Sequence, residues 1–307
     1  MLYLTQPKEL LMRKRTWKEY NQNLVNRGRL TFYIDPEALK PKKKRGRKRG
    51  RPRIFSHPLI QLLLILKIQF RLPYRALEGF AKDILPLFKK GVIIPSYSLI
   101  CRRAVELEAS LPKLSGKKPR IILLDATGVK IFGEGEWKVK IHGKSKRRRW
   151  IKIHIAIDAE TQEILQLEMT EGTVADCKIG PKLIKNCPKT AKLYMGDGGY
   201  DTKECRKAIK AKGAKALIPP RKNAKKNPKQ KERNEAIAER RGFGLDKVGM
   251  SLWGKLTGYS QRALVETSFS RLKRVYGGEL YSRKMGTQKV EGHLKCLMLN
   301  KMLSARG

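Results

Sequence analysis

The chain has 307 residues, 40% of them hydrophobic, and its 70 Lys and Arg against 27 Asp and Glu give a net charge of +43. This length allows one large domain or two of ordinary size, and the apolar content excludes a chain that is disordered throughout. So much like charge repels itself unless a polyanion neutralises it, so nucleic acid is the expected partner. Lys and Arg are spread along the whole chain, which disfavours a membrane-surface protein with its charge on one amphipathic helix.

Cysteine usage and hydropathy further restrict the class of protein to which the chain can belong. The five cysteines form no Cys-x-x-Cys pair and are odd in number, which disfavours a disulfide framework or a zinc site and fits a reducing cytoplasm. The N-terminus lacks the continuous apolar segment of a signal peptide. The longest apolar run, Leu59–Leu66, is interrupted by Gln61 and is shorter than the ~20 residues of a membrane span, so no membrane partner is expected.

The N-terminal part contains a strongly basic run. Residues 1–40 are mixed in composition, with a short helix expected around Trp17–Val25. Residues 41–53 hold nine Lys or Arg in thirteen positions, which indicates either a solvated linker or an arm on DNA. Arg49 and Arg51 lie in an Arg-Gly-Arg-Pro sequence, the core of an AT-hook that inserts arginines into a narrow A·T minor groove. Four residues of biased composition arise easily by chance, so DNA contact is favoured over a true AT-hook.

Residues 54–112 are expected to form a helical domain, whose first helix Ser56 can cap. The three helices are expected over Leu59–Phe70, over Tyr74–Leu87 and from Ser96 onwards. Arg102 and Arg103 lie on the third helix. Three short helices with arginines on the last resemble a helix-turn-helix DNA-binding domain, and a helical domain that only packs is an equal alternative.

From residue 118 the pattern changes to strands that alternate with helices. Strands are expected over Arg120–Leu124, Trp150–Ile157, Glu163–Met169, Lys192–Met195 and Ala216–Pro219. Helices are expected near Lys178–Lys185, over Thr202–Lys212 and over about Gln261–Tyr276. The order β-β-β-α-β-α-β-α is that of ribonuclease H. It predicts an α/β catalytic domain over residues 118–303, with a mixed sheet flanked by helices and a basic, partly helical insertion at about 221–255.

Two aspartates follow predicted core strands. Asp125 comes directly after a buried run, and Asp197 follows the fourth expected strand. The two strands are expected to be neighbours, which would bring the acids together. A charge placed after a buried strand costs desolvation unless it is paired or metal-bound, so both are candidate metal ligands; each alone could also be a turn aspartate. Asp201 has capping-box spacing to Glu204, and Asp176 precedes a predicted helix, so these two are interpreted as helix caps.

A third acid lies on the last predicted helix. Tyr259, Arg262, Glu266 and Lys273 fall at offsets of 0, 3, 7 and 14, and therefore project within a sector of about 60°. Glu266 can bind a metal ion while Arg262 and Lys273 hold phosphates. A solvated face with an Arg262–Glu266 pair is the alternative, but it leaves Tyr259 and Lys273 unexplained.

The spacing Tyr-x2-Arg-x3-Glu-x6-Lys resembles the YREK signature of DDE transposases encoded by bacterial insertion sequences. Other segments look like the IS-five family of these elements, and the resemblance covers roughly residues 50–303. These segments are Gly50–Arg53, Leu72–Phe80, Leu124–Gly128, Gly133–Trp137, Gly196–Asp201 and Ile218–Asn223.

The resemblance implies a transposase that binds terminal inverted repeats, cleaves the DNA ends and joins the 3′-OH ends to target DNA. Asp125, Asp197 and Glu266 would be the catalytic triad and would hold Mg²⁺, with Mn²⁺ as a substitute. Two such ions about 3.5–4 Å apart need hard oxygen ligands. The implied partners are double-stranded DNA and a second copy of the chain in the synaptic complex. The implied location is the bacterial cytoplasm, in association with the nucleoid.

In that interpretation Arg262 and Lys273 bind phosphates at the scissile bond, and Tyr259 contacts a distorted flanking nucleotide. Further backbone contacts are expected from the loop before the second strand, at Arg147, Arg148 and Arg149. Two alternatives stay open: a ribonuclease-H-fold DNA nuclease without strand transfer, and a non-enzymatic basic DNA-binding protein.

Overall fold

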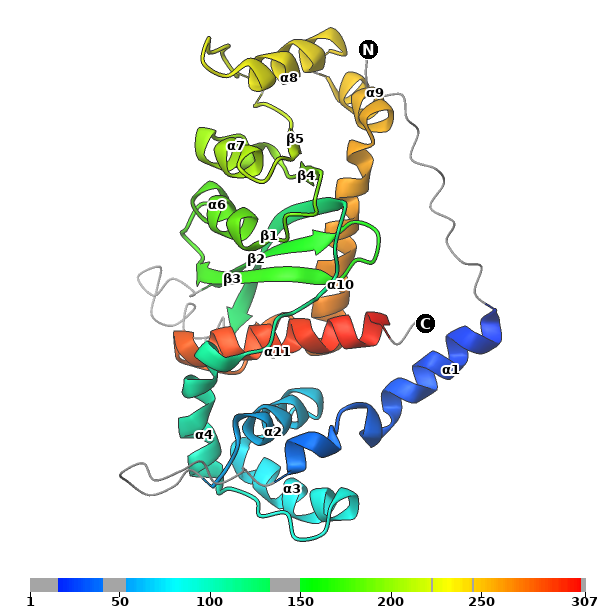
Figure 1. Ribbon diagram of the computed structural model, residues 1–307, viewed down its shortest axis with the longest axis vertical. Coiled ribbons are helices and arrows are strands. Elements are labelled where there is room, and N and C mark those ends of the chain that lie inside the picture. The colour runs from blue at the N-terminus through cyan, green and yellow to red at the C-terminus, as the bar shows by residue number, and fades with distance from the viewer. Residues whose placement is uncertain (1–15, 41–53, 133–149, 222, 245, 305–307) are drawn as a thin grey trace, which may run out of the picture. The chain divides into compact units, whose positions relative to one another are not determined.

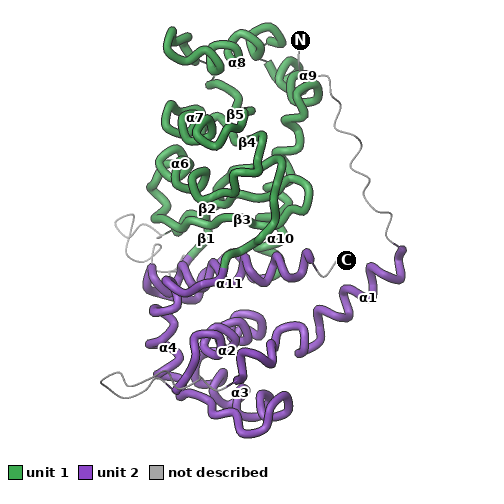
Figure 2. Tube along the Cα trace, viewed as in Figure 1, with its two compact units in different colours: residues 1–14, 113–130, 134–275 green, residues 15–112, 131–133, 276–307 purple. Residues whose placement is uncertain are grey.

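The computed structural model describes residues 16–40, 54–132, 150–221, 223–244 and 246–304 (Figure 1). The chain divides into two compact units (Figure 2). Unit 1 comprises Met1–Lys14, Lys113–Lys130 and Glu134–Val275. Unit 2 comprises Arg15–Pro112, Ile131–Gly133 and Tyr276–Gly307. Nothing in the described part of the chain is a helix long and apolar enough to span a membrane.

Unit 1 is built on a mixed sheet with the strand order β3-β2-β1-β4-β5. The strands are β1 (Ile121–Ile131), β2 (Trp150–Asp158), β3 (Ile164–Glu171), β4 (Leu193–Met195) and β5 (Lys215–Leu217). The first three pair antiparallel, whereas β4 and β5 join β1 in parallel. This is the ribonuclease-H-like α/β arrangement that the order of elements predicted, so the expected fold class is confirmed.

The strand β1 is longer than its apolar run predicted. Its pairing with β4 ends where Leu123 lies opposite Met195, but its pairing with β2 continues as far as Lys130. The long β2 partner therefore sustains β1 through the polar residues that follow Leu124. As a result Asp125 lies inside β1, at the point where the parallel pairing stops, and not after the end of a strand.

Helices cover both faces of this sheet. The helices α6 (Asp176–Asn186) and α7 (Lys203–Lys210) lie on one side, and α10 (Leu264–Tyr276) lies on the other (Figure 1). Ile122 and Leu124 belong to the hydrophobic core under α6 and α7. Because side chains alternate along a strand, Asp125 faces the opposite side, toward α10.

The predicted insertion forms two helices, α8 (Lys231–Gly242) and α9 (Lys247–Thr257). The segment Tyr259–Ala263 then forms a short 3-10 helix, η6, which leads directly into α10. The helix expected over about Gln261–Tyr276 therefore begins as a tighter turn. Gly258, in the left-handed conformation with φ of 74°, ends α9 and allows this change of direction.

The two aspartates predicted to cap helices have other roles. Thr202 caps α7, because its side chain accepts a hydrogen bond from Cys205 N at 3.3 Å, and this leaves Asp201 free to form ion pairs. The helix α6 has no side-chain cap, and Asp176 lies in its first turn, with Oδ1 2.7 Å from Lys152 Nζ. Both cap predictions are wrong because Lys152, Arg206 and Arg233 provide stronger, charged partners.

Unit 2 contains the helices predicted near the N-terminus. They are α1 (Trp17–Gly28), α2 (His57–Gln69), α3 (Tyr74–Phe88) and α4 (Tyr97–Glu106). Ser56 caps α2 as expected, because its side chain accepts a hydrogen bond from Leu59 N at 3.2 Å. Short 3-10 turns lie at Leu30–Phe32, Pro36–Leu39 and Leu107–Ser110.

The 20-residue helix α11 (Met285–Ser304) was not expected from the sequence. It packs against α2 and α4 within unit 2 and is buried on most of its surface. Its buried residues include polar ones, such as Gln288, Glu291 and Lys295. The helix therefore lacks the one-sided apolar stripe by which an amphipathic helix is recognised. A two-residue strand, β6 (Glu279–Leu280), precedes it, and Leu280 O accepts a hydrogen bond from Phe132 N at 2.8 Å.

Candidate active site

Asp125 is a partly buried carboxylate, and its side chain is 14% exposed. Its Oδ1 accepts a hydrogen bond from Ala126 N at 2.8 Å, and its Oδ2 lies 2.9 Å from Nη2 of Arg262. Burial raises the pKa of Asp125, Arg262 acts in the opposite direction, and the negative charges of Asp197 and Glu266 add to the rise. The three carboxylates are therefore close enough to influence one another.

Asp197 follows β4 and starts the short 3-10 turn η5 (Gly198–Tyr200). Its Oδ1 accepts a hydrogen bond from Gly199 N at 2.9 Å. A Cβ atom at Gly199 would lie 2.9 Å from this same oxygen, so a glycine is needed for the close approach. The register of β1 and β4 puts Asp125 and Asp197 two residues beyond the same pair, Leu123 and Met195. Parallel pairing thus accounts for the proximity of the two aspartates.

Glu266 lies in the first turn of α10, and its side chain is 63% exposed. Its Oε1 is 3.1 Å from Nη1 of Arg262. One guanidinium group therefore contacts both Glu266 and Asp125, which are far apart in the sequence. A solvated face would contain only the Arg262–Glu266 pair, so the contact with Asp125 shows that Arg262, on η6, faces β1.

The other two residues of the same face also reach the strands. The hydroxyl of Tyr259 donates a hydrogen bond to Gly196 O at 3.1 Å, next to Asp197. Burial raises the pKa of Tyr259 to about 12, so the phenol stays protonated at neutral pH. Nζ of Lys273 donates a hydrogen bond to Oγ1 of Thr127 on β1 at 2.8 Å. Three of the four residues singled out by their spacing therefore contact β1 or the carbonyl that follows β4, and the fourth, Glu266, contacts Arg262.

The donor set suits a divalent cation by its chemistry. Three carboxylates supply hard oxygen atoms, and their mutual repulsion, evident at Asp125, is relieved by a cation between them. Among the described residues, no three Asp, Glu, His or Cys side chains are grouped closely enough to hold a metal ion as they stand. In the present arrangement the guanidinium of Arg262 instead contacts both Asp125 and Glu266.

Of the remaining predicted DNA contacts, Arg102 and Arg103 are among the residues that the structure describes. Arg102 and Arg103 lie on α4 in unit 2, where Arg102 is exposed. Arg103 is 7% exposed, and its Nε lies 3.0 Å from Oε2 of Glu106, so this guanidinium is engaged within the fold. Five further predicted contacts lie outside the described residues, namely Arg49, Arg51, Arg147, Arg148 and Arg149.

The interpretation of the sequence missed a buried ion-pair cluster beside this site. The side chain of Asp201 is 1% exposed and pairs with Arg206 at 2.8 Å and with Arg233 at 2.9 Å. Arg233 is 32 residues from Asp201 and lies on α8, so no local pattern connects the two. The local signal is the pair of acids after β4, Asp197 and Asp201, and their spacing predicts one metal ligand and one helix cap.

Two family models, both described as "Transposase DDE domain", match this chain, one over residues 116–301 and the other over residues 25–134. The first covers more than half of the chain and includes Asp125, Asp197 and Glu266. The chain belongs to the family of transposase DDE domains.

A relative is found among curated proteins. The chain is 28% identical over 178 residues to an uncharacterized protein of Aquifex aeolicus (strain VF5). The alignment covers 50% of this chain and 51% of that protein, so the chain spans about half the length of this relative.

Proposed function

We propose that this protein is the transposase of a bacterial insertion sequence, which cleaves the ends of its element and joins the freed 3′-OH ends to target DNA. The observation that carries the proposal is the bridge formed by Arg262 between Asp125 on β1 and Glu266 on α10. It supports a single acidic centre built from a strand residue and a helix residue that lie 141 positions apart in the sequence. The membership of the DDE domain family supports the same chemistry.

Asp125, Asp197 and Glu266 are the proposed catalytic triad and the ligands of Mg²⁺, with Mn²⁺ as a substitute. When bound, the divalent ions supply activation of the attacking oxygen and stabilisation of the leaving oxygen of the phosphodiester. Arg262 and Lys273 are proposed to bind the phosphates on either side of the scissile bond, because both cations flank Glu266. Tyr259 is proposed to support Gly196 through its hydroxyl and to contact a flanking nucleotide with the exposed part of its ring.

The proposed element belongs to the IS-five family and its YREK group. The support is the ungapped spacing of Tyr259, Arg262, Glu266 and Lys273, together with the hydrogen bonds that tie three of them to β1 and to the Gly196 carbonyl after β4. Spacing alone could arise on a solvated helix. The contacts of three of these residues with β1 and with the Gly196 carbonyl after β4 give that spacing a structural reason.

Double-stranded DNA is the proposed partner, both as terminal inverted repeats and as target. As expected from the sequence, residues 54–112 are proposed to form the DNA-binding helices and residues 118–303 the catalytic domain. Arg102 on α4 is exposed and is proposed to contact the backbone, as are Arg49, Arg51 and residues 147–149. The protein is further proposed to act as a homodimer that brings two element ends together. Its proposed location is the nucleoid in the bacterial cytoplasm.

The test is a strand-transfer assay with Mg²⁺, a duplex carrying an end of the parent element, and a supercoiled target plasmid. We expect the wild-type chain to nick the end and to form joined product. Asp125→Asn, Asp197→Asn and Glu266→Gln should each reduce both products by at least 10³-fold, because each removes a proposed metal ligand. End binding, measured by fluorescence anisotropy, should stay within about threefold of wild type.

A matched control is Glu168→Gln, which removes a partly exposed carboxylate on β3 whose ion pair in the described part of the chain is with the exposed Lys182. This variant should keep its activity. Cleavage without any joined product would instead identify a nuclease. A triad variant that cleaves at the wild-type rate would remove that residue from the proposed centre.

A further inference from the structure

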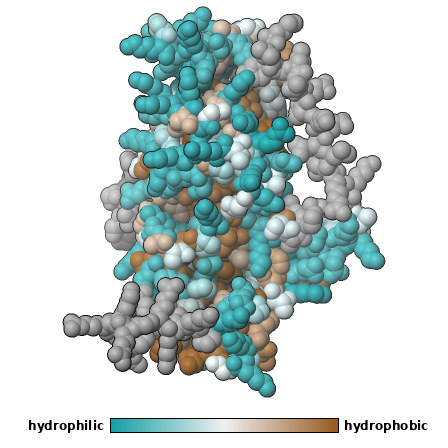
Figure 3. All heavy atoms as spheres, viewed as in Figure 1, coloured by the Kyte–Doolittle hydropathy of each residue, from teal (hydrophilic) through white to brown (hydrophobic). Residues whose placement is uncertain are grey.

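A basic groove lies in unit 1, between α7 and the segment that leads into α8. Its volume is about 780 Å³. Five of the residues that line it are lysines, and Glu232 is the one acid among its lining residues. The lysines are Lys203, Lys207, Lys210, Lys229 and Lys231. Over α7 and α8 the face seen in Figure 3 is predominantly hydrophilic.

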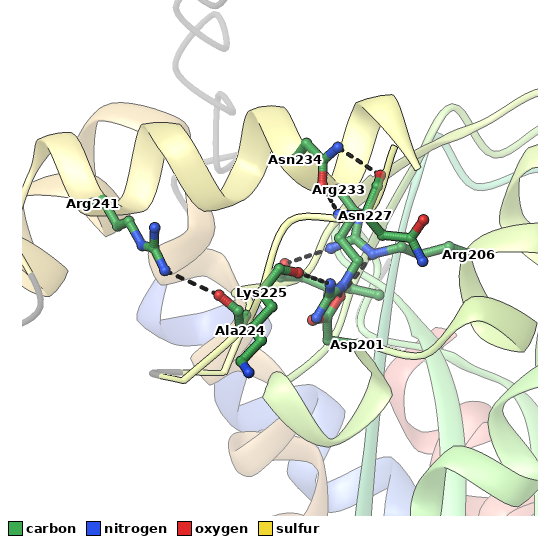
Figure 4. Close-up of polar contacts among 9 residues, drawn as sticks. Asp201, Arg206, Ala224, Lys225, Asn227, Arg233, Asn234 and Arg241 are labelled. Carbon is green, nitrogen blue, oxygen red and sulfur yellow. Dashed lines mark hydrogen bonds and ion pairs between the residues drawn. The ribbon is translucent and has the colours of Figure 1, made fainter. Parts of the chain in front are cut away.

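The buried carboxylate of Asp201 joins two arginines that line the groove. Arg206 from α7 and Arg233 from α8 both line the groove, and both form ion pairs with this carboxylate (Figure 4). Each arginine also donates to a backbone carbonyl: Nη2 of Arg206 to Ile218 O at 3.1 Å, and Nη1 of Arg233 to Lys225 O at 3.0 Å. Two guanidinium groups on one carboxylate leave an excess of positive charge, and the hydrogen bonds fix the two walls relative to each other.

The lysines on the α7 wall share one face of the helix. Lys203, Lys207 and Lys210 are spaced at i, i+4 and i+7, which brings them within a narrow sector of the helix, while Cys205 and Ile209 are buried on the opposite side. The only ion pair that links these lysines to Glu232 is a loose one, with Lys210 Nζ at 3.9 Å and both side chains largely exposed. Like charges in such a row repel one another unless a ligand supplies several negative charges.

We propose that this groove binds the sugar–phosphate backbone of DNA, independently of its base sequence. Lysine is a compact point charge that neutralises phosphates without reading base edges. Cations spread over two walls suit successive phosphates of a strand better than a single small anion. The inference rests on the proposed function in one respect, namely that DNA is the substrate. Asp201, which pairs with Arg206 and Arg233 of the groove, is four residues after Asp197, so a backbone bound here lies next to the segment that carries a proposed catalytic acid.

The test uses the full chain with three lysines neutralised: Lys203→Gln, Lys207→Gln and Lys231→Gln. None of these lysines forms an ion pair in the described structure, so the fold should be retained, which circular dichroism and thermal melting would check. Binding to a fluorescein-labelled 30-base-pair duplex of arbitrary sequence is measured by anisotropy between 50 and 300 mM KCl. We expect at least tenfold weaker binding at 150 mM KCl, and a slope of log K against log[KCl] that is flatter by about 2 to 3.

The matched control neutralises three exposed lysines of unit 1 that do not line the groove: Lys178→Gln, Lys185→Gln and Lys189→Gln. Its slope should change by less than about 1. Glu232→Gln tests the opposite direction, because removal of the acid should strengthen binding about two- to threefold. If the groove variant matches the control variant in affinity and slope, the inference is overturned.

Two further experiments are needed. The first separates this inference from the proposed function, and the second tests whether the groove distinguishes element-end DNA from DNA of arbitrary sequence. The groove substitutions are repeated on the Asp125→Asn background, where they should weaken binding equally, because the groove needs no catalysis. If wild-type protein cleaves DNA but the groove variant binds like the control, the groove alone is wrong. Equal losses on arbitrary and element-end duplexes support a sequence-independent site, whereas a loss confined to element ends would contradict it.

Discussion

The guanidinium of Arg262 illustrates how one residue can set the state of the candidate site. It lies between Asp125 and Glu266 and is 22% exposed, so it compensates two carboxylates that would otherwise repel each other. Burial lowers the pKa of Arg262, but the surrounding acids outweigh this and raise it overall. Arg262 therefore stays charged at neutral pH.

His154 on β2 provides a pH prediction. It is fully buried, and its Nε2 lies 2.9 Å from Oγ1 of Thr170. Burial lowers the pKa of His154 to about 4, with Asp176 acting in the opposite direction. In the unfolded chain the pKa is about 6.5, so between these two values the unfolded state binds the extra proton. The stability contributed by neutral His154 is therefore fully present above about pH 6.5 and is lost as the pH falls toward 4.

We expect the free energy of unfolding to fall by about 2 kcal/mol from this residue between pH 7 and pH 5. Urea unfolding of the wild-type chain and of His154→Gln at both pH values measures the difference. Glutamine preserves a polar group near Thr170 but does not titrate, so the variant should be less stable at pH 7 and less sensitive to pH. An equal loss of stability in both proteins would show that other groups are responsible.

At the scale of elements, α11 depends on a buried ion pair. Glu291 accepts hydrogen bonds from Tyr281 N at 3.0 Å and from Ser282 N at 2.8 Å, and it lies 2.8 Å from Lys295. Burial by itself raises the pKa of Glu291, but Lys295 and the two amides outweigh it and hold the pKa below its ordinary value. The carboxylate thus joins the start of α11 to the chain after β6.

Glu291→Gln should destabilise unit 2 by about 3 to 5 kcal/mol, because it leaves Lys295 buried without a counter-charge. The matched control is Glu108→Gln, which breaks the exposed pair with Lys289 in the same unit and should cost less than about 1 kcal/mol. Urea unfolding followed by circular dichroism compares the two. Equal midpoints for both variants would contradict a structural role for the buried pair.

At the scale of the whole molecule, the net charge of +43 predicts strongly salt-dependent binding to DNA. Nine of these positive charges lie in residues 42–53. Deletion of this segment should weaken binding to an arbitrary duplex and flatten the dependence on KCl. Replacement by a Gly-Ser segment of equal length should have the same effect, because it preserves the tether and removes the charge. Restoration of wild-type binding by the Gly-Ser segment would identify residues 42–53 as a linker only.

Local patterns were sufficient for most of the elements in this chain. Periodicity predicted β2 and α3 nearly to the residue, and the Ser56 cap was visible as a polar residue before an apolar run. The spacing of Tyr259, Arg262, Glu266 and Lys273 identified the helix face that contacts the strands. Periodicity, capping and helical spacing depend on residues that are close together in the sequence, so they predict local structure without knowledge of the fold.

The features that the sequence did not predict depend on residues that are distant in the sequence but adjacent in space. Asp125 proved to lie inside β1 because β2 continues beside it, and Asp201 proved to be an ion-pair centre because α8 brings Arg233 to it. The sequence pattern does not predict the helix α11, because α11 is buried on most of its surface. A helix that is buried on several sides has no amphipathic pattern. In each case the outcome depends on which elements are adjacent in space, and desolvation and charge pairing act between them at distances along the chain that no local pattern spans.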